Sequence, residues 1–151
     1  MTIHETLKKG IPEALRAHDE VRLRTLRSLV TAMTNELVAK KRKPDQLLTD
    51  DEAIAILKRA ANQRRDSIEQ FEKAGRTDLA DPEKEELSIV GSYLPAQMTR
   101  EEITRIAETK IAELGVTQKA DAGKLIGALM KDVSGKADGA DVKAVVDSLL
   151  A

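Results

Sequence analysis

Apolar residues recur at intervals of three and four along most of this chain, the spacing that places side chains on one face of an α-helix. Leu23, Leu26, Val30, Met33 and Leu37 follow this spacing without interruption. The pattern predicts helices over about residues 3–18, 20–42, 50–74, 82–93, 100–114, 118–133 and 140–150. No stretch alternates apolar and polar residues for long enough to predict a strand. The sequence therefore indicates an all-α protein.

Helix-start signals support these boundaries. The segments 49–52 and 99–102 each read Thr-x-x-Glu, a capping box in which each of the two side chains accepts a hydrogen bond from the other residue's backbone N–H. Pro82 suits the first position of a helix, because proline lacks the N–H that this position leaves unpaired. Gly10 and Pro12 are expected to kink or divide the first helix, since both disfavour a helix interior.

Two of the predicted helices, 20–42 and 50–74, are long and carry narrow apolar stripes, which predicts an extended hairpin rather than a compact globule. The proline-containing stretch 93–98 comes just before a new capping box and marks a domain boundary. We expect an N-terminal helical domain, residues 1–93, and a small C-terminal three-helix domain, residues 94–151. The residues expected to face the core of the second domain are Ile103, Ile106, Ile126, Leu129, Val142, Val146 and Leu149.

The composition narrows the class of protein. Charged residues make up 34% and hydrophobic residues 41% of the chain, which fits a folded protein with a well-solvated surface. There is no cysteine, and no apolar run approaches the roughly 20 residues that span a bilayer. The first residues include the acidic Glu5 and no apolar signal core, so a cytoplasmic location and no membrane partner are expected. The net charge of −1 means that nucleic-acid binding would need a local basic patch.

Candidates for catalysis are few. The two histidines, His4 and His18, lie 14 residues apart, which does not suit a pair of metal ligands, and both are expected to be solvated. No P-loop, G-x-G-x-x-G or G-x-S-x-G motif occurs. The sequence therefore predicts no catalytic residues, no metal site and no cofactor.

The segment 22–43 has an excess of positive charge, with seven cationic side chains against one acid, Glu36. Such an excess can follow a phosphate backbone and release its counterions. The alternative is a solvated hairpin tip whose cations complement the dipole at the end of helix 20–42. The residues taken as a secondary basic patch are Arg24, Arg27, Lys40, Lys41, Arg42 and Lys43.

Arg64 occupies an apolar-stripe position of the helix predicted over 50–74. Its stem can lie along apolar neighbours while the guanidinium reaches water, or the guanidinium can pair with a buried acid or hold a ligand. The pattern favours the first of these arrangements.

The most specific signal is in the segment 121–139, where Gly123 and Gly127 fall inside a predicted helix. A glycine in a helix interior costs roughly 1 kcal/mol relative to alanine, so something is expected to approach this backbone closely. Either a neighbouring helix or a ligand such as a sugar-phosphate chain would account for the two glycines. Lys124 and Lys131 are seven residues apart and share a helix face beside the two glycines. These lysines favour the ligand over the neighbouring helix.

The segments 69–80, 86–87 and 93–97 resemble the bacterial YqeY-like proteins, and 123–130 and 135–139 look like the second half of the same pattern. The resemblance implies a helical N-terminal part and a three-helix tail similar to the C-terminal domain of GatB, a subunit of tRNA-dependent amidotransferase. That domain contacts the elbow region of tRNA. Carried onto this sequence, the RNA-binding set that the resemblance implies is Gly123, Lys124, Gly127, Lys131, Gly135, Lys136 and Gly139.

The expected function is that of a tRNA-binding module that recognises structured RNA by shape and backbone, because Tyr93 and Phe71 are too few aromatics for base stacking. The implied partners are tRNA and an aminoacyl-tRNA synthetase or amidotransferase, which the module would assist. Two alternatives stay open: a protein–protein adaptor, and a carbon–nitrogen ligase with glutamine as amide donor, which is a label this family carries. The ligase ranks last, because the chain has no counterpart of the domains that would activate glutamate or release ammonia.

Overall fold

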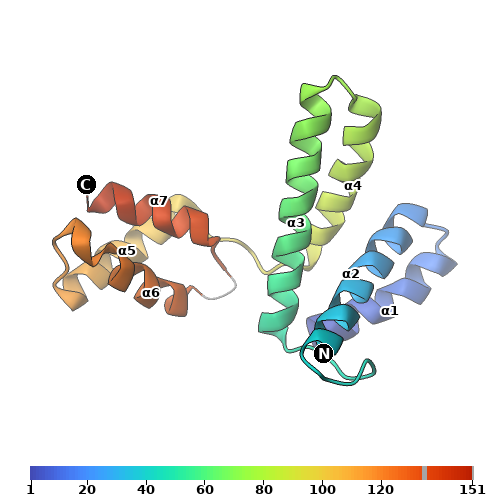
Figure 1. Ribbon diagram of the computed structural model, residues 1–151, viewed down its shortest axis with the longest axis horizontal. Coiled ribbons are helices and arrows are strands. Elements are labelled where there is room, and N and C mark those ends of the chain that lie inside the picture. Colours follow the sequence, from blue (N-terminus) through green and yellow to red (C-terminus); the bar gives the residue numbers. More distant parts are fainter. Residues whose placement is uncertain (134–135, 151) are drawn as a thin grey trace. The chain divides into compact units, whose positions relative to one another are not determined.

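The computed structural model describes residues 1–133 and 136–150 and is helical throughout (Figure 1). Seven α-helices lie in these residues, together with one short 3₁₀ turn, η1 (Lys119–Asp121). The helices are α1 (Ile3–Arg16), α2 (Glu20–Ala39), α3 (Asp50–Lys73), α4 (Thr77–Tyr93), α5 (Arg100–Leu114), α6 (Ala122–Asp132) and α7 (Gly139–Leu149). The prediction of an all-α fold is confirmed. None of the described helices is both long and apolar enough to cross a membrane.

The chain divides into two compact units, Met1–Leu94 and Pro95–Ala151. Each unit has its own buried apolar cluster. In the first unit the cluster is centred on residues of α2 and α3, among them Leu26, Met33 and Leu57, which are fully buried.

The first unit is built from two helix pairs, α1 with α2 and α3 with α4 (Figure 1). The expected hairpin between helices 20–42 and 50–74 is wrong, because α2 and α3 touch each other far less than either touches its own partner. Loop length gives the reason. Three residues join α1 to α2 and three join α3 to α4, whereas the loop 40–49 separates α2 from α3. Short connections force helices to lie side by side, and long ones do not.

The close approach of α1 to α2 depends on Gly10. A Cβ atom at this position would lie 2.8 Å from Cδ1 of Leu26 and 3.3 Å from the hydroxyl of Tyr93. The helix runs unbroken through Gly10 and Pro12, so the expectation that these residues divide it is wrong. Packing against α2 explains the glycine.

Helix α4 begins at Thr77, before the expected start at Pro82. Proline at this interior position leaves only the carbonyl of Asp78 without its usual i+4 donor. The preceding turn is held by Ala80, which is fully buried, and by a 3.0 Å ion pair between Arg76 and Asp78. Burial therefore overrides the proline signal.

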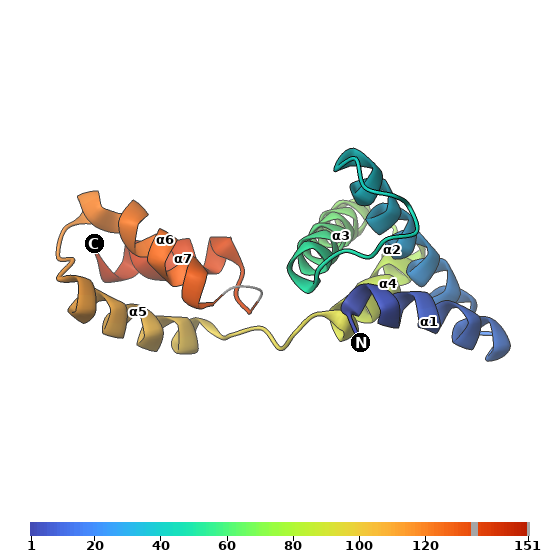
Figure 2. The ribbon, with the colours of Figure 1, turned by 90° about the horizontal axis from the view of Figure 1, so that it is seen from below.

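The second unit packs α5, α6 and α7 around one apolar core (Figure 2). Four of the expected core residues are buried: Ile103, Leu129, Val142 and Val146. The other three, Ile106, Ile126 and Leu149, are partly buried against the same cluster. Both predicted capping boxes, at 49–52 and 99–102, form with their reciprocal hydrogen bonds.

Candidate nucleic-acid interface

The outward face of α6 carries the two helix glycines. Leu125 and Leu129 of this helix are fully buried, and at about 100° per residue the side opposite them is occupied by Gly123 and Gly127. Both glycines are exposed, and a Cβ added at either would meet nothing within 4 Å. No neighbouring helix therefore requires a bare backbone at these positions.

Lys124 and Lys131 share this outward face. Both are exposed, and among the described residues neither forms an ion pair. Asp132 lies next in the chain to Lys131, but its carboxylate pairs with Nζ of Lys110 on α5 at 2.9 Å. Hydrogen bonding to Asp132, and then to Glu113, raises the pKa of Lys110. The face thus presents two ammonium groups, without an ion pair in the part of the chain that the structure describes, beside an exposed backbone.

The remaining predicted RNA-binding residues follow α6 in the chain. Lys136 is exposed, and its carbonyl accepts a 2.6 Å hydrogen bond from the backbone N–H of Met98. Gly139 is the first residue of α7, is exposed, and has open space where a Cβ would lie. Gly135 lies outside the described residues. The structure thus groups four of the set on one face of α6 and places Lys136 and Gly139 beyond its C-terminal end.

The secondary basic patch is not one surface of free cations. Arg24 lies 3.5 Å from Glu86 of α4, and Lys40 and Arg42 lie 2.9 and 3.0 Å from Glu52 of α3. The members without an ion pair among the described residues are Arg27, Lys41 and Lys43. Residue 27 lies roughly 18 Å along the axis of α2 from the end of that helix, and Lys41 and Lys43 follow beyond it. The charge excess of the segment 22–43 therefore serves largely internal contacts.

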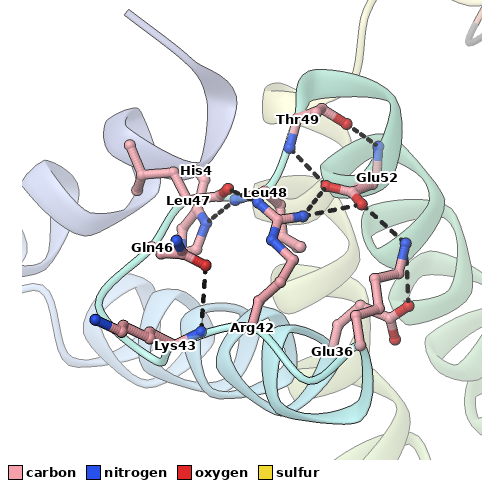
Figure 3. Close-up of polar contacts among 10 residues, drawn as sticks. His4, Glu36, Arg42, Lys43, Gln46, Leu47, Leu48, Thr49 and Glu52 are labelled. Atoms are coloured by element: carbon pink, nitrogen blue, oxygen red, sulfur yellow. Dashed lines mark hydrogen bonds and ion pairs between the residues drawn. The ribbon is translucent and has the colours of Figure 1, made fainter.

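Glu52 is the acid that pairs with both Lys40 and Arg42 (Figure 3). Its carboxylate accepts from Lys40, from Arg42 and from the backbone N–H of Thr49, which completes the capping box of α3. Lys40 contributes most to lowering the pKa of Glu52 to about 2, followed by the Thr49 N–H. Arg42 also donates to the carbonyl of Leu47. These bonds hold the loop 40–49 against the start of α3.

Arg64 pairs with an acid rather than reaching water. Its side chain is only 11% exposed, its Nη1 donates to the carbonyl of Ala60 at 3.0 Å, and its Nε lies 3.9 Å from Glu86. The favoured arrangement, with the guanidinium in solvent, is wrong. Because Glu86 is also close to Arg24, this acid joins α2, α3 and α4.

His4 was expected to be solvated, and this is wrong: the side chain is fully buried, with Nδ1 accepting from the backbone N–H of Leu48 at 3.0 Å. The sequence holds a signal for this burial, because His4, Leu7 and Ala14 belong to one apolar stripe of helical spacing. His18 is exposed and lies in the turn after α1 with a φ of 56°.

Comparison with known proteins gives a family across nearly the whole chain. The family described as Yqey-like protein matches residues 4–150. Curated relatives bear the name "Altered inheritance of mitochondria protein 41, mitochondrial". The one from Vanderwaltozyma polyspora is 35% identical over 89 residues, covering 58% of this chain and 46% of the relative. The one from Eremothecium gossypii is 32% identical over 117 residues, covering 76% and 62%. The one from Pyrenophora tritici-repentis is 27% identical over 138 residues, covering 87% and 71%.

These names correct the expected location. The chain spans about half the length of the first of these relatives, and all three are named as mitochondrial proteins, which contradicts the prediction of a cytoplasmic one. The prediction rested on the first residues, which include an acid and no apolar signal core, and on the lack of cysteine and of a long apolar run. None of these features distinguishes the cytosol from the interior of a mitochondrion, so they were an insufficient basis.

Proposed function

Since the chain belongs to the Yqey-like protein family, we propose that it binds structured RNA, tRNA in particular, through the outward face of α6. The observation that carries this proposal is the exposure of Gly123 and Gly127, with nothing within 4 Å of where their side chains would be. A solvent-facing helix position gains about 0.8–1 kcal/mol when glycine becomes alanine. Gly127 lies in the interior of α6 and Gly123 is its second residue, so the cost to the isolated protein falls mainly at Gly127. A ligand that must approach the backbone closely would account for both glycines.

The neighbouring charges favour a polyanion over an apolar partner helix. Lys124 and Lys131 stand beside the glycines and form no ion pair within the described residues, and Asp132, which follows Lys131 in the chain, is engaged by Lys110. Ammonium groups in this position can contact phosphates and release their counterions. An apolar partner helix would gain nothing from them.

The manner of recognition follows from the absence of aromatic side chains in the second unit. Both aromatics of the chain, Phe71 and Tyr93, lie in the first unit. Stacking of splayed bases on the α6 face has no platform, so recognition would depend on backbone and shape. This fits the elbow of a folded tRNA better than a single strand.

The finer part of the proposal concerns the partner enzyme. The second unit resembles the C-terminal domain of the GatB subunit, and by this likeness the chain would hold tRNA for an amidotransferase or an aminoacyl-tRNA synthetase. In that arrangement the chemistry belongs to the partner, and this chain supplies capture of the RNA.

The test is charge reversal on α6. Lys124→Glu with Lys131→Glu should abolish binding of tRNA in a filter assay at low salt, because two attractive contacts become repulsive. The matched control is Lys9→Glu with Arg105→Glu, which makes the same change in net charge at exposed positions of α1 and α5. If both double variants bind tRNA equally, the α6 face is not the interface. If neither the variants nor the unmodified protein binds RNA but a protein co-purifies without RNA, the adaptor replaces this proposal.

A further inference from the structure

His4 ties α1 to the loop 40–49 through a bond that depends on its protonation state (Figure 3). The ring is fully buried, and its Nδ1 accepts from the Leu48 N–H at 3.0 Å. A ring nitrogen that accepts carries no proton, so the imidazole is neutral with its proton on Nε2. Nε2 is itself buried and has no hydrogen-bond partner in the described part of the chain.

The loop is also attached to α3 through Glu52 and to the core through Leu48. Arg42 bonds to Glu52 of α3 and to the Leu47 carbonyl, and the side chain of Leu48 is 1% exposed in the core. The loop also carries Lys41 and Lys43 on its exposed side. The His4 bond is the attachment that links this loop directly to the first helix.

Charges on α1 itself partly oppose one another at His4. Burial lowers the pKa of the His4 imidazole, and Lys8 lowers it further, whereas Glu5 acts in the opposite direction. The ring is therefore neutral near pH 7 and gains a proton only at a pH below its ordinary value of 6.5.

Helix α3 brings two carboxylates, Asp50 and Glu52, to this end of α1 and to the loop. From α3, Asp50 accepts from the Ile3 N–H at 2.9 Å, and Glu52 is engaged by Lys40 and Arg42. Because the pKa of Glu52 is about 2, this carboxylate stays ionised and keeps its partners between pH 7 and pH 4. A change at Leu48 within that range therefore does not come from the bonds of Glu52.

We propose that His4 is an acid-sensitive latch, which releases Leu48, near the end of the loop 40–49, from α1 when Nδ1 takes a proton from solvent. Protonation removes the acceptor of the Leu48 N–H and leaves two donors facing each other in a buried space. The latch is closed above about pH 6.5 and opens as the pH falls through the lowered value. The helices stay folded and Glu52 keeps Lys40 and Arg42, while the end of the loop at Leu48 loses its hydrogen bond to α1.

Amide hydrogen exchange followed by NMR tests the latch residue by residue. Between pH 7 and pH 4, the protection factor of the Leu48 amide should fall at least about tenfold, the order expected for one lost bond at a buried donor. The protection factor of Leu57, in the core of α3, should stay unchanged. His4→Asn and His4→Gln each offer a carbonyl acceptor that does not titrate, and should remove the pH dependence at Leu48. His18→Asn is the matched control and should retain it.

Three outcomes would overturn the latch. The first is a Leu48 protection factor that does not change between pH 7 and pH 4 in the unmodified protein. The second is the same loss in both His4 variants as in the unmodified protein. The third is a parallel loss at Leu48 and Leu57, which would mean unfolding of the whole unit. None of these outcomes bears on RNA binding, because the latch lies in the first unit.

Discussion

The two basic regions of this molecule differ in what their charges face. Around the loop 40–49, Lys40 and Arg42 meet the carboxylate of Glu52 and stabilise the start of α3. On α6, Lys124 and Lys131 meet no acid among the described residues and stand beside exposed glycines. The first region has the higher density of positive charge and the second has the open surface. Cationic side chains without internal partners therefore indicate a binding surface better than the number of cationic residues in a segment does.

The glycines divide in the same way. A Cβ at Gly10 would meet Leu26 and Tyr93, whereas a Cβ at Gly123 or Gly127 would meet nothing within 4 Å. Packing within the fold explains Gly10 and does not explain Gly123 and Gly127. Substitutions at these positions test that difference.

The largest effect is expected from enlarging the packed glycine. Gly10→Leu should destabilise the first unit by about 1–3 kcal/mol, because the new side chain is forced against Leu26 and Tyr93. Gly127→Leu, the matched change on α6, should cause no loss of stability. Urea unfolding of the two variants checks this. Equal destabilisation by both would show that α6 packs against something on its outward side.

The next effect has the opposite sign. Gly123→Ala with Gly127→Ala should raise the stability of the second unit by about 1–2 kcal/mol, since alanine favours the helix at both positions. The same variant should bind tRNA more weakly, because two methyl groups now stand between ligand and backbone. Thermal unfolding and filter binding on one preparation measure both quantities. A gain in stability with unchanged RNA affinity would remove the glycines from the proposed interface.

A smaller pair of effects separates the two basic regions. Arg42→Ala should lower stability, because Glu52 and the Leu47 carbonyl each lose a partner, and should leave RNA affinity nearly unchanged. Lys131→Ala should change stability by less than about 0.5 kcal/mol. It should also reduce the slope of log affinity against log salt by about 1. The contrast fails if Arg42→Ala has the larger effect on that slope.

The smallest effect is a change in acid stability. The pKa of Glu52 is lowered from 4.5 to about 2, so its ionised form stabilises the folded state above pH 4.5. That contribution is lost as the pH falls from 4.5 towards 2. Glu52→Gln should therefore flatten the dependence of the unfolding free energy on pH in this window. The change is partial, because the pKa values of Glu5, Glu69 and Asp78 are also lowered. Identical pH profiles for the two proteins would contradict it.

Local signals predicted most of the secondary structure. The Thr-x-x-Glu boxes placed the starts of α3 and α5 at the correct residues, because a cap is formed by atoms three residues apart. Pro82 misled because its preference was outweighed by the burial of Ala80, a contact between helices that no local pattern contains. The pairing of helices was missed for a related reason. The width of an apolar stripe indicates how much of a helix surface is buried, whereas the length of the connecting loop determines which neighbouring helix buries it.

The candidate site shows the same division. The positions of Gly123, Gly127, Lys124 and Lys131 on one face follow from helix periodicity and were readable from the sequence. Whether that face is open depended on the packing of α5 and α7, which periodicity does not determine. In the first unit, the acids that neutralise Arg24 and Arg42 come from other helices, so counting charges along one segment could not find them.

The hydrogen bond from the Met98 N–H to the Lys136 carbonyl affects where the second unit can be cut free. All three helices begin at or after Arg100, so a fragment starting at Thr99 would retain each of them. It would nevertheless lack the donor that Lys136 uses and the side chain of Met98, which packs against the apolar cluster. The smallest fragment of the second unit that folds alone should therefore include Met98. The backbone amides of a fragment that starts at Thr99 should exchange with solvent faster.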